Sequence, residues 1–282
     1  MTYKKILFKY LDVKNLKIIF LVLILIYLKI GFKYNKILLD KISVIIPTYN
    51  RGHLILNSIG SVLNQTYKNI EVLLIDDGSS DDTENIINNL EDKRIRYIKL
   101  NKNKGASNAR NIGIKLASGK YISFQDSDDF YHYDKIEKQY KNLIKKKSDF
   151  DFCKVNFYLN ETYKVIFPLK SQEYNIMRNK ISSELCNGNF ITTQSILVKT
   201  NVIRKYLFDP NFQRLQDYDL VLRMVPNMKV SYTSKILVDL YRKKDSIGNS
   251  PKKYNESLNL ILNKKYDIKC NLESFYKQFN KN

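Results

Sequence analysis

Residues 121–129 have the sequence YISFQDSDD, in which a short β-prone run leads directly into three carboxylates within four positions. Clustered carboxylates repel one another unless a cation or bound water offsets their charge. Asp126 and Asp128 form an Asp-x-Asp pair whose side chains lean the same way in an extended chain, so both can serve one hard cation. The stretch therefore predicts a metal site at the carboxyl end of a strand, with an ordinary solvated acidic turn as the alternative.

The residues before this stretch alternate between β-branched runs and segments of helical hydrophobic period. Strands are expected at 42–46, 70–75, 96–100 and 121–124, with helices at 53–65, from 81, and at 105–117. This order predicts a mostly parallel sheet with right-handed crossovers and helices on both faces. Three polar loops, Thr48–Arg51, Asp76–Ser79 and Asp126–Asp129, would then meet at the carboxyl edge of the sheet. Their convergence favours a nucleotide pocket over a solvated turn.

The composition is that of a folded protein, with 44% hydrophobic and 12% aromatic residues among 282. Enough apolar surface is present to offset the entropy of the chain, so disorder is excluded. The three cysteines, Cys153, Cys186 and Cys270, are odd in number and widely spaced. Their spacing fits neither a disulfide framework nor a zinc cluster and favours a reducing compartment.

The net charge of +20 is unevenly distributed. Residues 1–41 hold nine Lys/Arg against two acids, residues 42–130 hold eleven against eleven, and residues 131–282 hold twenty-eight against fifteen. The neutral 42–130 half argues against a nucleic-acid binder, and we expect none as a partner. A membrane surface or a phosphate-bearing acceptor explains the excess, and a lysine-rich solvated face is the alternative.

The N-terminal arm, residues 1–41, contains an uninterrupted apolar run from Ile18 to Leu28 between Lys17 and Lys29. Eleven residues are short of the roughly 17–25 that cross a bilayer, although snorkelling lysines extend the reach. No small-x-small cleavage pattern follows, so an uncleaved anchor or interfacial helix is predicted, with a buried core helix as the alternative. The flanking charges are too even for the positive-inside rule to fix an orientation.

Four motifs in order carry a family resemblance: Ser43–Arg51, Ile75–Thr83, Gly105–Asn111 and Asp126–Asp129. Together they resemble the inverting nucleotide-sugar glycosyltransferases of family 2, closely over residues 42–130 and more loosely to about 250. The resemblance implies an α/β, GT-A-type, Rossmann-like fold. The expected architecture is then a mostly parallel sheet with helices on both faces, plus an N-terminal hydrophobic helix.

The resemblance also implies contacts to the nucleoside. Thr48 and Tyr49 would lie under the base, where an aromatic face suits stacking. Asp77 would accept a hydrogen bond from the base imide, which favours uracil or thymine over purines. Asp126 would face the ribose. These matches predict a UDP-sugar donor.

Contacts to the diphosphate are implied in the same way. Arg110 lies near the start of a helix whose dipole favours anions, so a phosphate contact is expected there. Asp128 would hold Mg²⁺ or Mn²⁺ bridging the diphosphate. The alternatives are a packed aromatic at Tyr49 and a surface arginine at Arg110.

The segment Gln216–Arg223 resembles the family segment in which Gln-Asp or Glu-Asp opens a helix and the Asp is the catalytic base. Asp217 is therefore the predicted base, because an inverting transfer needs one carboxylate near the acceptor hydroxyl. Asp219 would point elsewhere on a helix, and a simple N-cap is the alternative for Asp217. Tyr241–Gly248 resembles the closing Tyr-Arg segment but lacks the histidine that many members place near Lys244.

The predicted organisation is the 1–41 arm, a 42–250 transferase domain and a 251–282 amphipathic tail that either packs or touches a membrane. Residues 42–130 would form the nucleotide-sugar half and residues 131–250 the acceptor half. The predicted function is transfer of a hexose or N-acetylhexosamine to a glycan or lipid-linked acceptor during surface polysaccharide, lipopolysaccharide or glycolipid synthesis. The expected location is a membrane surface, with the catalytic domain facing the cytoplasm. The alternative is a non-catalytic binding protein of the same fold.

Overall fold

The computed structural model describes residues 21, 40–160, 163–241, 250–268 and 272. Its contacts divide the chain into two units, residues 1–40 and residues 41–282, and the second contains every strand of the described chain. The predicted N-terminal hydrophobic helix lies outside the described residues, apart from Leu21. Among the described residues, no helix combines the length and the apolar character needed to cross a lipid bilayer.

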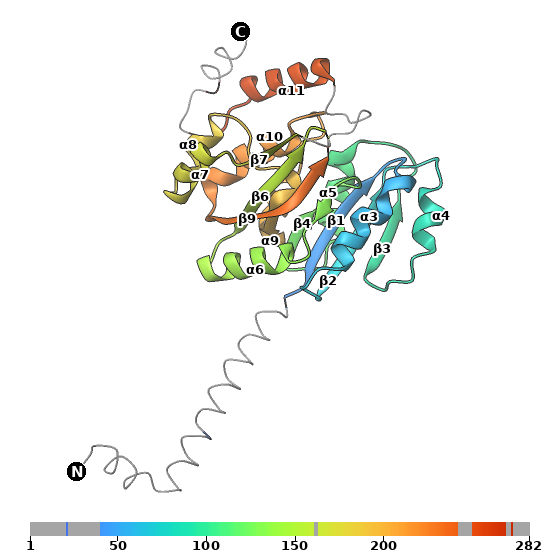
Figure 1. Cartoon of the computed structure of the whole chain (residues 1–282). Helices are drawn as coiled ribbons and strands as arrows, with labels where there is room; N and C mark the ends of the chain where they lie inside the picture. The colour runs from blue at the N-terminus through green and yellow to red at the C-terminus, as the bar shows by residue number, and fades with distance from the viewer. Residues whose placement is uncertain (1–20, 22–39, 161–162, 242–249, 269–271, 273–282) are drawn as a thin grey trace, which may run out of the picture. The chain divides into compact units, whose positions relative to one another are not determined.

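The described chain folds as one sheet flanked by helices (Figure 1). Its strands are β1 Ile42–Thr48, β2 Ile70–Asp76, β3 Ile95–Lys99, β4 Tyr121–Phe124, β5 Phe130–Tyr131, β6 Phe150–Tyr158, β7 Lys164–Phe167, β8 Ile196–Lys199 and β9 Val230–Tyr241. The helices are α3 Gly52–Leu63, α4 Thr83–Asn88, α5 Ala106–Leu116, α6 Lys135–Lys146, α7 Lys170–Met177, α8 Ile181–Leu185, α9 Thr200–Tyr206, α10 Gln216–Met224 and α11 Pro251–Asn263. Two 3₁₀ turns, η1 Thr193–Ser195 and η2 Val225–Asn227, complete the order.

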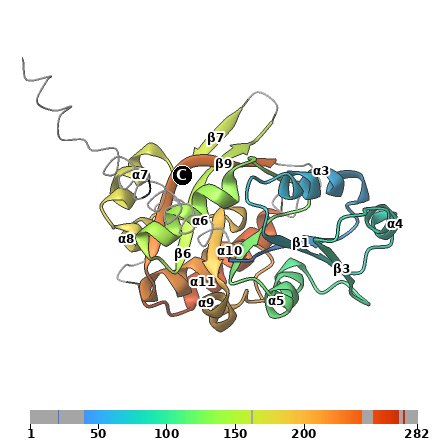
Figure 2. The same ribbon diagram turned by 90° about the horizontal axis from the view of Figure 1, so that it is seen from below.

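The first half follows the predicted β-α-β-α-β-α-β order. Strands β1, β2, β3 and β4 are parallel and lie in the order β3-β2-β1-β4. Because the order reverses after β3, crossovers of one hand place α3 and α4 on one face and α5 on the other (Figure 2). Helix α5 packs closely on β1, since a Cβ at Gly113 would lie 2.5 Å from Ile45 Cγ2.

The expectation of a mostly parallel sheet is wrong, because the later half makes the sheet mixed. The order continues β4-β8-β6-β9-β5, and β7 pairs with the later part of β6, Val155–Tyr158. The pairs β4–β8, β6–β8, β6–β7 and β5–β9 are antiparallel, whereas β6–β9 is parallel. The β6–β7 pair is a hairpin, and such short connections favour antiparallel pairing.

Helix α11 belongs to the packed body of the second unit. Leu258 and Ile261 are buried in the hydrophobic core that also contains residues of α10. Over residues 251–263 the sequence pattern thus forms a packed helix. Cys153 is a buried free thiol, whereas Cys186 is disulfide-bonded, which differs from the expectation of cysteines without a disulfide role.

Candidate active site

A cavity of about 1400 Å³ opens at the carboxyl ends of the parallel strands. This is the edge where the strand order reverses between β1 and β4, and ligands of open α/β sheets bind at such a point. The opposite wall comes from η1, from the loop before α10 and from α11. All seven residues predicted from the sequence line this one cavity: Thr48, Tyr49, Asp77, Arg110, Asp126, Asp128 and Asp217.

The loops after β1 and β2 are fixed against each other. The Asp77 amide donates to the Thr48 carbonyl at 2.8 Å. The Asp77 carboxylate accepts from the amides of Lys104 at 2.9 Å and Gly105 at 2.6 Å. A carboxylate offers about four acceptor sites, so Asp77 retains capacity for a ligand. Tyr49 exposes 43% of its surface, as a stacking side chain at a cavity wall requires.

Asp76 has a structural role that the sequence left open. It is fully buried and accepts from the Ser79 amide at 2.7 Å and from the Tyr97 hydroxyl at 2.5 Å. These contacts shape the turn in which Gly78 adopts a φ of 84°. Asp76 is therefore occupied within the protein, whereas Asp77 lines the cavity.

Arg110 and Asp126, predicted to contact phosphate and ribose, form an ion pair with each other. The Arg110 Nη2–Asp126 Oδ1 distance is 2.6 Å, and Arg110 Nη1 donates to Gln216 Oε1 at 2.9 Å. The other oxygen of Asp126 accepts from Gln194 Nε2 at 2.6 Å. Among the described residues, the buried Arg110 Nε and Thr48 Oγ1 have no hydrogen-bond partner. Buried polar atoms are usually bonded, so these two atoms favour a ligand site.

Asp129, whose role the sequence left open, anchors the acidic turn. Its carboxylate accepts from the Tyr241 amide at 3.0 Å and from Gln194 Nε2 at 2.7 Å. Burial, with Asp128 and Asp126 nearby, raises the pKa of Asp129 well above its ordinary value. Gln194, which sequence reasoning missed, thus joins two carboxylates of the turn. The polar stretch before β8 gave no motif that would have identified it.

The residues at the turn fit a divalent cation bound together with a diphosphate. Within the part of the chain that the structure describes, no three His, Cys, Asp or Glu side chains are grouped to hold a metal alone. Mg²⁺ in nucleotide sites commonly takes one or two carboxylates and completes its shell with phosphate oxygens and water. Asp128 lines the cavity and supplies such a carboxylate.

Asp217 lies in the first turn of α10 and lines the cavity. A backbone hydrogen bond from Thr193 reaches the Asp217 carboxylate. The Tyr218 amide donates to Asp217 Oδ1 at 2.8 Å, and the roughly four acceptor sites of a carboxylate leave capacity for a substrate. Burial raises the pKa of Asp217 above its ordinary value, against the opposing effects of that hydrogen bond and of Arg110. A carboxylate with a raised pKa is a stronger base, as general base catalysis needs.

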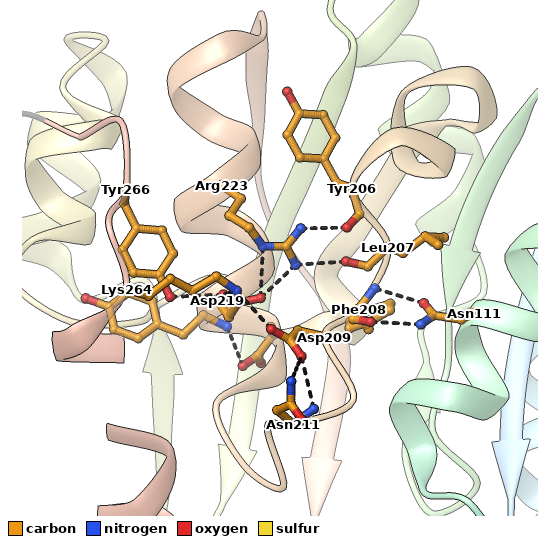
Figure 3. Close-up of polar contacts among 12 residues, drawn as sticks. Asn111, Tyr206, Leu207, Phe208, Asp209, Asn211, Asp219, Arg223, Lys264 and Tyr266 are labelled. Carbon is orange, nitrogen blue, oxygen red and sulfur yellow. Dashed lines mark hydrogen bonds and ion pairs between the residues drawn. The ribbon is translucent and has the colours of Figure 1, made fainter. Parts of the chain in front are cut away.

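Asp219 is instead fully buried, at the centre of a network of polar contacts (Figure 3). Its oxygens accept from Arg223 Nη2 at 2.7 Å, Lys264 Nζ at 2.7 Å and the Tyr266 hydroxyl at 2.9 Å. Lys264 also pairs with Asp209 at 3.0 Å. This network ties α10 to the segment after α11, and Asp219 does not line the cavity.

The wall opposite the acidic turn carries two cations that sequence reasoning did not assign. Arg214 and Lys253 both line the cavity, together with Tyr254. The Arg214 guanidinium lies 4.9 Å from the centre of the Tyr254 ring. The amphipathic period of α11 predicted a helix, but a period cannot show what its inner face lines. The expected closing segment after Tyr241 lies outside the described residues.

Solved structures with this architecture define the class. S. aureus TarS residues 1–349, crystallised with UDP-GlcNAc, aligns with a TM-score of 0.67 and 20% identity over 86% of this chain and 73% of TarS. The mannosyltransferase PcManGT of Pyrobaculum calidifontis, solved with GDP-Man and Mn²⁺, aligns with a TM-score of 0.62 and 16% identity over 80% of this chain and 66% of that protein. The fold is that of the GT-A nucleotide-sugar transferases.

Residues 43–207, more than half of the chain, match the model of glycosyl transferase family 2. A glycosyltransferase of Haemophilus influenzae is 36% identical over 67% of this chain and 74% of its own length. The chain belongs to glycosyl transferase family 2.

Two relatives carry names that specify a reaction. Escherichia coli WfgD, named as a UDP-Glc:α-D-GlcNAc-diphosphoundecaprenol β-1,3-glucosyltransferase, is 32% identical over 67% of this chain and 72% of its own length. WfaP of Escherichia coli, named for the same reaction, is 42% identical over 44% of this chain and 49% of its length. Against a glycosyltransferase of Rickettsia felis, 38% identical over 63% of this chain, the match covers 29% of the relative.

Proposed function

We propose that this protein is an inverting glycosyltransferase that moves a hexose or N-acetylhexosamine from a UDP-sugar to a lipid-linked glycan acceptor. The observation that carries the proposal is that seven residues predicted from separate motifs line one cavity. The names of the Escherichia coli relatives support a UDP-sugar donor and a diphosphate-linked acceptor. Such an acceptor belongs to surface polysaccharide or related glycolipid synthesis.

The residues act on the donor as follows. Tyr49 stacks on the base and Asp77 accepts from its imide. Asp126 contacts the ribose, while the adjacent Arg110 charge offsets the negative diphosphate. A Mg²⁺ or Mn²⁺ ion held by Asp128, when bound, supplies Lewis acidity to the leaving diphosphate.

Asp217 acts on the acceptor. It takes the proton of the acceptor hydroxyl as that oxygen attacks the anomeric carbon on the side opposite the diphosphate. The raised pKa of Asp217 favours this proton transfer. Arg214 and Lys253, on the same side of the cavity, contact the phosphates of a lipid-linked acceptor.

The 1–41 arm, the 42–250 transferase domain and the C-terminal segment form the working protein in this proposal. The basic arm holds the protein at the membrane, with the 42–250 domain on the cytoplasmic side, where nucleotide sugars are present. Anionic lipids attract such clusters of Lys and Arg.

A donor screen tests the proposal. The protein is given UDP-, dTDP- and GDP-sugars, Mn²⁺ or Mg²⁺ and a diphosphate-lipid-linked N-acetylglucosamine, and nucleotide release and transfer are both measured. We expect release with a UDP-sugar that is abolished by Asp128→Ala and by Asp217→Ala. Activity undiminished in both variants contradicts the assignment of these residues. UDP binding without release from any donor favours the non-catalytic alternative.

A further inference from the structure

Exposed apolar side chains concentrate on one short segment. Twelve large hydrophobic residues are exposed among the described residues, and five of them fall between residues 163 and 177. Single exposed hydrophobics are normal on a soluble surface, but a group of them marks a contact site. The five are Tyr163, Ile166, Leu169, Tyr174 and Met177.

The edge strand β7 has two different faces. It pairs with β6 alone, and its residues alternate between exposed and half-buried. Lys164 and Ile166 are exposed on the outer face. On the inner face Phe167 contacts Phe157, with ring centres 6.5 Å apart, and both rings line the active-site cavity. The outer face of β7 therefore points away from the cavity, on the opposite side of the strand from Phe167.

Helix α7 follows β7 in the chain, separated from it only by Pro168 and Leu169 (Figure 1). Lys170, Tyr174, Met177 and Arg178 are spaced i, i+4, i+7 and i+8, which places them on one side of the helix. All four are exposed, whereas Ile176 is buried against the body. Arg178 Nη1 donates to the Tyr174 hydroxyl at 2.6 Å, so an aromatic and a cation stand together there.

The charged residues of this segment, 163–180, indicate what kind of partner it binds. Residues 163–180 carry four exposed cations, Lys164, Lys170, Arg178 and Lys180. Their one acid, Glu173, is half-buried and accepts from Lys154 Nζ at 2.6 Å and from the Tyr232 hydroxyl at 3.0 Å. Lysine is depleted at protein–protein interfaces. Apolar side chains combined with exposed Lys and Arg are typical of surfaces that enter the headgroup region of anionic bilayers.

We propose that the outer faces of β7 and α7, residues 163–180, form a docking surface for an anionic lipid bilayer. Ile166, Leu169, Tyr174 and Met177 enter the headgroup region, and the four cations pair with lipid phosphates. This contact brings the Phe167 wall of the cavity to the membrane, where a lipid-linked acceptor resides. That consequence rests on the proposed function, whereas the docking itself does not.

Because the chain contains no tryptophan, one introduced tryptophan reports on its own position. Tyr174→Trp places it on the docking surface, and Leu56→Trp places a matched reporter at an exposed hydrophobic position of α3, outside residues 163–180. The full chain is titrated with phosphatidylcholine vesicles containing phosphatidylglycerol. We expect a blue shift at position 174 and quenching by brominated lipid, with neither at position 56.

Binding of vesicles without a shift at position 174 overturns the proposal, because the N-terminal arm then carries the contact alone. A shift at position 174 that needs no vesicles and grows with protein concentration also overturns it, since a second copy is then the partner.

An activity measurement uses the triple variant Ile166→Ser/Leu169→Ser/Met177→Ser. We expect at least a tenfold loss of transfer to a lipid-linked acceptor in anionic vesicles, with donor hydrolysis unchanged. Vesicle transfer that is unchanged in the triple variant contradicts the docking role. If the wild-type protein does not hydrolyse the donor, the proposed function is wrong, and the tryptophan measurement still tests the docking.

Discussion

Asp217 and Asp219 lie two residues apart at the start of α10 but meet different surroundings. One carboxylate lines the cavity, whereas the other is enclosed by Arg223, Lys264 and Tyr266. On a helix, residues two apart point to different sides. The proposed function gives Asp217 a chemical role, and the buried contacts of Asp219 predict a role in stability.

Exchanging each carboxylate for an amide separates the two roles. Asp217→Asn should lower kcat by about 10²–10⁴-fold, the usual contribution of a general base, with no fall in Tm. Asp219→Asn removes the fully buried charge that pairs with Arg223 and Lys264, and should cost roughly 3–5 kcal/mol of unfolding free energy. Asp209→Asn removes only the half-buried end of the network and should cost about 1 kcal/mol or less. Steady-state kinetics and urea denaturation measure both effects, and a stable but inactive Asp219→Asn would reverse the assignment.

The acid limb of the pH profile reports Asp217. The base works ionised, so activity falls as the pH falls through its pKa, and burial has raised that pKa above the ordinary value. We expect kcat/KM to decline at a pH above the ordinary Asp pKa of about 3.9. Asp217→Glu should keep an acid limb at reduced rate, and Asp217→Asn should lose it. If the decline of kcat/KM at low pH persists unchanged in Asp217→Asn, a different titrating residue causes it and Asp217 is not the base.

At the scale of elements, Gln194 in η1 holds the acidic turn after β4 through both Asp126 and Asp129. Gln194→Leu removes both hydrogen bonds, and each buried acceptor left unpaired costs about 1–3 kcal/mol. We expect the KM of the donor to rise about tenfold or more, because the turn that carries Asp128 loses its support. Asn142→Leu, which removes contacts to Asp151 and to the Tyr232 carbonyl away from the cavity, should lower Tm without changing the donor KM.

The elements of the first half were predictable because local rules governed them. Parallel strands buried on both faces read as continuous apolar runs, and the crossover rule then places their polar ends together. Strand β9, Val230–Tyr241, escaped prediction although it is rich in β-branched residues, because its pairing with β6 shifts register near Thr233–Ile236 and breaks the alternation. The mixed parallel and antiparallel pairing of the sheet was not predicted for another reason. The pairing of β8 with β4 and β6 joins segments distant in sequence, which no local pattern encodes.

The same distinction applies to the site. Thr48, Tyr49, Asp77 and Asp128 follow strand ends in recognisable motifs, and all four line the cavity. Gln194 and Lys253 carry no motif, and only the packing of the later half onto the sheet brings them there.

At the scale of the whole molecule, the cavity joins walls from both ends of the described chain. Residues of β1 and Asp77, just after β2, line the same cavity as residues of α11, which lies beyond the 43–207 family match. The acidic turn and the cations of the far wall thus face one space, suited to a donor on one side and a phosphate-bearing acceptor on the other.

A charge-removing variant tests that division. Lys253→Met keeps the aliphatic stem and should raise the KM of a diphosphate-linked acceptor about tenfold, the scale of a lost charge-assisted hydrogen bond. Donor hydrolysis should be unchanged. Lys252→Met, on the exposed side of α11, is the matched control and should leave both constants unchanged. A raised donor KM in Lys253→Met would move this lysine to the donor side.

The stereochemistry of the product tests the central claim most directly. With one base at Asp217 and in-line attack, an α-linked UDP-sugar gives a β-linked product, read from the anomeric proton coupling by NMR. We predict inversion in the wild type and product formation slowed about 10²–10⁴-fold in Asp217→Asn. A product that retains the α configuration would contradict the single-displacement account of this cavity.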